Sequence, residues 1–124
     1  MSKKIACTVA IALLMGVAPA LAQNAVCVEP TLPAMVDGST ASREQVIASI
    51  AAAKDFVAKS DVYQQCIADD LDAKKKAAGA AFDDQVHTVA MAKVAANQGA
   101  KDKLVADTNT QANIYKNRVS TAGK

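Results

Sequence analysis

Apolar residues recur at steps of three and four along residues 42–78, the spacing that places side chains on one face of an α-helix. The face is formed by Val46, Ile50, Ala53, Val57, Ser60, Tyr63, Ile67 and Leu71. No proline or glycine interrupts this segment, and Ser42 and Gln45 have the spacing of a capping box at its start. The pattern therefore predicts one long helix with a single buried stripe.

A second helical pattern follows Gly79, from about Ala80 to Val119. Its predicted buried positions are Phe82, Val86, Val89, Ala96, Ala100, Leu104, Tyr115 and Val119. Because glycine tolerates turn conformations that other residues avoid, Gly79 is expected to separate the two segments.

Two architectures fit these segments: a long antiparallel helical hairpin with an arm packed alongside, or a small bundle of four shorter helices. Ser60-Asp61 in the first segment and Gly99 in the second are the points where a helix would kink or break. Neither point has the several loop residues that a bundle usually places between its helices. We therefore predict an all-α fold in the form of the hairpin.

Residues 23–41 have the composition of an extended arm. Pro30 and Pro33 oppose helix formation and favour polyproline-like geometry, and Asp37-Gly38-Ser39 is typical of a turn. The predicted organisation is thus an arm over residues 23–41 followed by a helical domain over residues 42–124.

Residues 1–22 have the three zones of a secretory signal peptide. Lys3 and Lys4 give a positive start, residues 5–17 are an uncharged apolar run, and Ala20 and Ala22 form a small-residue cleavage site. The apolar run is shorter than the about 20 residues that a membrane span needs. We therefore expect cleavage after Ala22 and a periplasmic or secreted protein, as in a Gram-negative bacterial envelope.

A lipid anchor is the nearest alternative, since Cys27 lies soon after the apolar run. It fits poorly, because such sites require small residues directly before the cysteine and Asn24-Ala25-Val26 stands there. No later segment is long and apolar enough to span a bilayer, so we expect no membrane span after cleavage.

The net charge of the chain falls once the predicted signal peptide is removed. Loss of Lys3 and Lys4 leaves 12 basic and 12 acidic side chains, so the net charge is close to zero. This balance removes the electrostatic argument for a nucleic-acid partner. Large apolar residues make up only about a fifth of the remaining chain, which indicates a thin core that benefits from outside support.

Cys27 and Cys66 are the cysteines that follow the predicted signal, and we expect them to form an intrachain disulfide that ties the arm back to the first helix. An intermolecular bridge and two free thiols are the alternatives. A helix from Ser42 to Cys66 is about 36 Å long, and an extended arm of about 15 residues reaches about 50 Å. The bond is therefore feasible if the arm runs back along the helix.

The densest polar cluster surrounds the predicted turn. It comprises Asp69, Asp70, Asp72, Lys74, Lys75, Lys76, Asp83, Asp84 and His87. Asp83 and Asp84 lie one helical turn from His87, so carboxylate and imidazole are placed to grip a divalent cation. The simpler interpretation is a solvated surface in which lysines offset the carboxylates, and we expect no metal site.

Nothing in the chain has the pattern of a catalytic or cofactor site. His87 is the sole histidine, and neither a haem-attachment C-x-x-C-H nor a G-x-S-x-G motif is present. We therefore expect no enzyme activity and no cofactor. The sequence is typical of a small exported helical protein that acts through protein contacts, as an envelope structural or chaperone-like factor. Its expected partner is another envelope or periplasmic protein, or a second copy of the chain. The alternative function is a small-ligand or metal-binding module using the Asp/His cluster.

Overall fold

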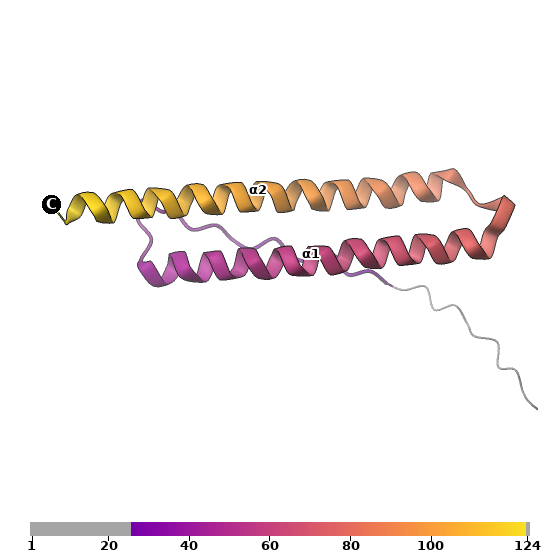
Figure 1. The fold of residues 1–124 in the computed structure, drawn as a ribbon, viewed down its shortest axis with the longest axis horizontal. Helices are drawn as coiled ribbons and strands as arrows, with labels where there is room; N and C mark the ends of the chain where they lie inside the picture. Colours follow the sequence, from indigo (N-terminus) through magenta and orange to yellow (C-terminus); the bar gives the residue numbers. More distant parts are fainter. Residues whose placement is uncertain (1–25, 124) are drawn as a thin grey trace, which may run out of the picture.

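The computed structural model describes residues 26–123, which form two long α-helices lying side by side and antiparallel (Figure 1). Helix α1 spans Arg43–Ala78, the short 3-10 turn η1 spans Gly79–Ala81, and α2 spans Asp84–Ala122. Both helices pass through the suspected break points without interruption. The predicted all-α hairpin is thus confirmed over the four-helix alternative. The predicted signal peptide, residues 1–22, lies outside the described residues.

Local side-chain chemistry fixes the start and end of α1. The Ser42 hydroxyl accepts a hydrogen bond from the backbone N–H of Gln45, and the Gln45 side chain accepts one from the backbone N–H of Ser42. This is the predicted capping box, which satisfies backbone donors that have no partner inside the helix. The helix ends at Ala78 and is capped by Gly79, whose φ of 53° lies in the left-handed region that favours glycine.

Helix α2 begins four residues later than the sequence pattern predicted. Gly79–Ala81 forms the 3-10 turn, and Phe82 has an extended backbone. Asp83 then caps α2, because its carboxylate accepts a hydrogen bond of 2.8 Å from the backbone N–H of Gln85. Aspartate favours this cap position over the helix interior, since its short side chain reaches the first free N–H groups.

The buried stripe of α1 is close to the predicted one. It consists of Val46, Ser49, Ala53, Phe56, Ser60, Tyr63, Ile67 and Leu71. Two predicted members, Ile50 and Val57, are only half-buried at its edge. The steps of three and four average close to 3.5 residues, the spacing by which paired helices keep one seam in contact.

The buried face of α2 differs from the prediction. Its buried residues are Asn97, Leu104 and Thr108, whereas Val89 and Val119 are exposed. Two of these three buried side chains are polar, so apolar periodicity could not reveal the face. The continuous apolar core is correspondingly small and consists of Ala53, Phe56 and Leu104, with Ala100 packed against it.

The arm runs back along the hairpin toward the middle of α1 (Figure 1). Every third residue of the arm is half-buried, namely Cys27, Pro30, Pro33 and Val36. The residues between them are exposed. A repeat of three is that of polyproline II, so the arm presents one edge to the helices. At about 3.1 Å per residue the arm spans about 34 Å from Cys27 to Gly38, which matches the length of α1 that it follows.

A turn joins the arm to α1. The carbonyl of Asp37 accepts hydrogen bonds from the backbone N–H groups of Thr40 (3.1 Å) and Ala41 (2.8 Å). The Asp37 carboxylate accepts from the backbone N–H of Ser39 at 2.8 Å. The predicted turn at Asp37-Gly38-Ser39 is present. Neither of the described helices is long and apolar enough to cross a membrane.

Candidate functional site

A disulfide ties the start of the described arm to the middle of α1. Cys27 and Cys66 are bonded, with a Cα–Cα distance of 5.7 Å. The predicted intrachain pairing is confirmed. Closing a loop of this sequence separation, 39 residues, stabilises a fold by about 4 kcal/mol through the reduced entropy of the unfolded chain.

The other end of the arm contacts α2. The backbone N–H of Gly38 donates a hydrogen bond of 2.8 Å to the side-chain carbonyl of Gln111. The hydroxyl of Thr108 donates to the sulfur of Met35 at 3.6 Å. A Cβ atom on Gly38 would lie 2.0 Å from the backbone oxygen of Gln111. Glycine is therefore required at this close approach of two backbones.

Arg118 completes the attachment of the arm. Its guanidinium donates a hydrogen bond to the carbonyl of Ala41 and lies 5.3 Å from the centre of the Tyr115 ring. A charge-assisted bond of this kind is stronger than one between neutral groups. The arm is thus held by a covalent bond at one end and by polar contacts at the other.

A polar layer interrupts the seam halfway along the hairpin. Asn97 and Ser60 have exposed fractions of only 1% and 0%. The amide nitrogen of Asn97 donates to the Ser60 hydroxyl at 3.3 Å, and Gln64 donates to Asn97 at 2.9 Å and to Gln98 at 3.2 Å. A buried asparagine in such a seam favours one register, because any shift leaves its amide without partners.

An ion pair closes the side of this layer. The ammonium of Lys101 lies 2.6 Å from the carboxylate of Asp61, and the Lys101 side chain is largely buried. The pair joins α1 and α2 at the same level as Asn97. Together these contacts explain why both helices continue through Ser60 and Gly99 instead of breaking there.

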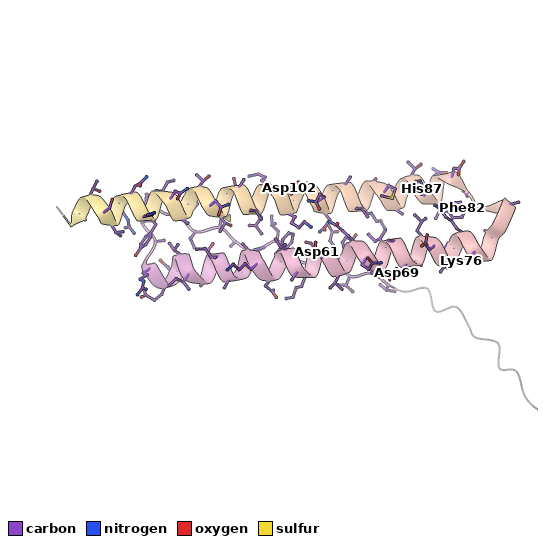
Figure 2. The ribbon with its side chains drawn as sticks, viewed as in Figure 1. Asp61, Asp69, Lys76, Phe82, His87 and Asp102 are labelled. Atoms are coloured by element: carbon purple, nitrogen blue, oxygen red, sulfur yellow. A yellow bond between two sulfur atoms is a disulfide. The ribbon has the colours of Figure 1, made fainter. Side chains whose placement is uncertain are left out.

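The Asp/His cluster does not converge on one point. Asp69 accepts a hydrogen bond from Gln65, and Asp70 pairs with Lys74 at 2.6 Å, each within a single helix. In Figure 2 Asp69 lies on α1 and His87 on α2. Within residues 26–123, no three histidine, cysteine or acidic side chains gather closely enough to hold a metal ion.

The turn residues of the cluster also have local roles. Asp83 caps α2, Asp84 lies in the first turn of that helix, and Lys75 lies 5.7 Å from the centre of the Phe82 ring. Carboxylates in the first turn favour a helix, because they interact with its partial positive charge. These contacts stabilise the end of the hairpin.

The structure instead brings apolar side chains together in two open clefts between the helices. The first, of about 250 Å³, is lined by Ile50, Ala53, Lys54, Val57, Val105, Thr108 and Asn109. At about 100° per residue, Val57 lies about 180° around α1 from Cys66, so on α1 this cleft lies on the face opposite the disulfide. We refer to it as the outer cleft.

The second cleft, of about 310 Å³, lies beside Val26 and Cys27, the first described residues of the arm. It is lined by Val26, Cys27, Tyr63, Ile67, Asp70, Leu71, Lys74, Val86, Val89, Ala90 and Lys93. We refer to it as the arm-end cleft. The sequence did not reveal either cleft, because each combines side chains that lie far apart along the chain. Exposed valines in the second helix were the available signal, and they were assigned to the buried face instead.

Tyr63 forms part of the arm-end cleft, and its ring is buried. Burial, with a smaller contribution from the nearby Glu29 carboxylate, raises the pKa of Tyr63 above its ordinary 10.0. The phenol is therefore neutral at physiological pH, and the cleft carries no tyrosinate charge.

Comparisons of the chain with protein-family models, with curated proteins and with solved structures find no match. A helical hairpin by itself does not imply a function, so the function is inferred from the chemistry of the clefts.

Proposed function

We propose that this protein is a small exported helical protein without enzymatic activity, which acts through contacts with other polypeptides as an envelope structural or chaperone-like factor. The observation that carries the proposal is the exposure of aliphatic side chains in open clefts on a narrow hairpin. Val105 in the outer cleft is 42% exposed, and Val89 in the arm-end cleft is 51% exposed.

Burial of such side chains by a partner is favourable by about 25 cal/mol for each Å² of apolar area removed from water. Apolar patches on a protein surface are typical of sites that bind other proteins. The outer cleft has walls from both helices, with Ile50 and Val57 opposite Val105. An apolar side chain that protrudes from a partner would therefore pack against the aliphatic walls of the outer cleft.

Export is the second part of the proposal. Its support is the signal-like composition of residues 1–22 together with the Cys27–Cys66 bond, because disulfides persist in oxidising compartments such as the periplasm. The proposed partners are accordingly proteins of the same compartment, or a second copy of this chain.

Suppression of aggregation tests the proposed activity. A chemically denatured model protein is diluted into buffer with and without the purified, disulfide-bonded chain, and light scattering is followed. We expect the chain to reduce scattering at near-stoichiometric ratios. Val105→Asp should weaken this effect, since it places a charge in the outer cleft.

Val62→Asp provides the matched control, because Val62 is 71% exposed and lies beside the arm, away from the outer cleft. Circular dichroism establishes that each variant is folded. Equal scattering with and without the chain would contradict the chaperone-like role, and equal suppression by wild type and Val105→Asp would exclude the outer cleft.

A further inference from the structure

The arm is fastened to the hairpin at its two ends by different kinds of contact. The Cys27–Cys66 bond fixes one end to α1. At the other end the contacts with α2 are hydrogen bonds, and they are made by Met35, Gly38 and Ala41. We refer to the part of the arm from the disulfide to the first of these hydrogen bonds, residues 27–34, as the strap.

The side chains of the strap hold it only weakly on the helices. Val28 and Leu32 are 78% and 55% exposed, and Pro30 and Pro33 are half-buried. Polyproline II has no internal hydrogen bonds, and each residue that is kept in one conformation costs conformational entropy. The disulfide, more than the packing of the strap, therefore keeps it against the helices.

Tyr63 lies partly beneath the strap. It comes three residues after Ser60 and three residues before Cys66, so it lies about 60° around α1 from each of them. Ser60 faces α2, where Asn97 donates a hydrogen bond to it, and Cys66 carries the arm. The Tyr63 ring is thus covered by α2 on one side and by the strap on the other. This double cover accounts for its exposed fraction of only 6%.

The start of the strap separates two hollows. Val26, Cys27 and Tyr63 line both the arm-end cleft and a second hollow of about 430 Å³. Cys27 and Cys66 both line the second hollow, and each is half-buried. A small dithiol therefore reaches their bond from this side, and removal of the strap would join the two hollows over the Tyr63 ring.

The seam of the hairpin does not pass through the strap. Phe56 of α1 packs with Leu104 of α2 in the apolar core, and Lys101 of α2 pairs with Asp61 of α1. These contacts join the two helices directly. Loss of the disulfide should therefore release the strap and leave the hairpin in place.

We propose that the Cys27–Cys66 bond is a redox-operated latch, which holds the strap over Tyr63 when it is oxidised and frees the strap when it is reduced. This inference goes beyond the proposed function, because it does not depend on which partner binds. The hydrogen bonds of Met35 and Gly38 to α2 keep the freed strap attached. The latch can therefore close again.

A dithiol reductant opens the latch by thiol–disulfide exchange. One thiolate of the reductant attacks a cysteine sulfur, forms a mixed disulfide and releases the other cysteine as a thiolate, which takes up a proton. The second thiol of the reductant then displaces the remaining cysteine. Two electrons and two protons pass to the two cysteines, and the reductant becomes a disulfide. Exchange with an oxidised disulfide reverses these steps and closes the latch.

Tyrosine fluorescence tests the proposal, because the chain contains no tryptophan and two tyrosines. In a Tyr115→Phe protein the signal comes from Tyr63 alone. Acrylamide quenching is measured before and after reduction with dithiothreitol and removal of the reductant. Fluorescence lifetimes convert each result to a quenching rate constant, since a neighbouring disulfide also shortens the lifetime. We expect the rate constant to rise several-fold on reduction and to return to its first value on reoxidation with oxidised glutathione, while circular dichroism shows unchanged helix content.

Cys27→Ser combined with Cys66→Ser, in the same Tyr115→Phe protein, is the matched control. Its strap has no latch, so its quenching rate constant should equal that of the reduced protein and should not respond to dithiothreitol. A rate constant that stays the same on reduction of the latch would overturn the proposal, because the strap would then be held by its packing. Loss of helix on reduction, or a bond that resists dithiothreitol until denaturant is added, would also contradict it. No partner takes part in this measurement, so its failure would leave the proposed function standing.

Discussion

Replacement of Gly38 by alanine is expected to destabilise the fold, because there is no space for the added methyl group. The added Cβ would lie 2.0 Å from the backbone oxygen of Gln111 and 3.0 Å from the backbone nitrogen of Tyr115. Both atoms belong to the rigid interior of α2, so neither can move aside as a flexible side chain would. The turn that joins the arm to α1 must shift instead.

The cost follows from the contacts that this shift breaks. The hydrogen bond from Gly38 to Gln111 contributes about 1 kcal/mol, and overpacking of a close contact costs about 1 to 3 kcal/mol. We therefore expect Gly38→Ala to destabilise the protein by about 2 to 4 kcal/mol. For a domain of about 100 residues this lowers the Tm by at least about 8 °C.

Gly99→Ala is the matched control, because the same methyl group there meets nothing within 4 Å and the position is inside α2. Alanine is favoured over glycine in a helix by about 1 kcal/mol, so this variant should be more stable than wild type. Thermal unfolding followed by circular dichroism measures both. An unchanged or raised Tm for Gly38→Ala would refute the packing of the arm against α2.

Three other parts of the hairpin give further expected outcomes. Cys27→Ser combined with Cys66→Ser should reduce stability by about 4 kcal/mol, measured by urea unfolding, and an unchanged midpoint would show that the bond adds nothing. Asn97→Ala should cost about 2 to 3 kcal/mol in the same assay, because it leaves buried partners without hydrogen bonds, whereas the exposed Asn109→Ala should change little. Since the pKa of Tyr63 is raised in the folded state, its contribution is complete below pH 10.0 and is lost as pH rises through the higher folded value. Tyr63→Phe should therefore lose less stability than wild type as the pH rises above 10.0; parallel curves for the two proteins would contradict this.

The features of the fold that could be predicted are those encoded locally. The capping box at Ser42 and the buried stripe of α1 follow from residue types at fixed spacing, since Val46, Tyr63 and Ile67 mark the seam clearly. The disulfide followed from the presence of Cys27 and Cys66 outside the predicted signal. The arm geometry followed from its prolines.

The register of α2 could not be predicted in the same way. Its contact face includes Asn97 and Thr108, and the ion pair of Lys101 with Asp61 adds a charged member. Polar residues at a helix seam become visible only when their partners on the other helix are known. The spacing of apolar residues in α2 therefore predicted burial for valines, such as Val89, that the structure places on the surface.

The Asp/His cluster, which the sequence offered only as the site of the alternative function, does not converge among residues 26–123. Sequence proximity made the acidic residues before the turn look like one group. On a helix, however, successive residues point about 100° apart, so Asp69, Asp70 and Asp72 diverge around α1. The clefts arise from residues on both helices and the arm, and their composition depends on the register.

The central claim is that the apolar clefts of this hairpin bind non-native polypeptide. Sedimentation velocity of the purified protein, mixed with a reduced and carboxymethylated protein that cannot fold, measures this most directly. The account predicts that the two sediment together, and that Val105→Asp combined with Val89→Asp abolishes the complex while the hairpin stays folded. Independent sedimentation of the wild-type protein and the unfolded chain would contradict the account.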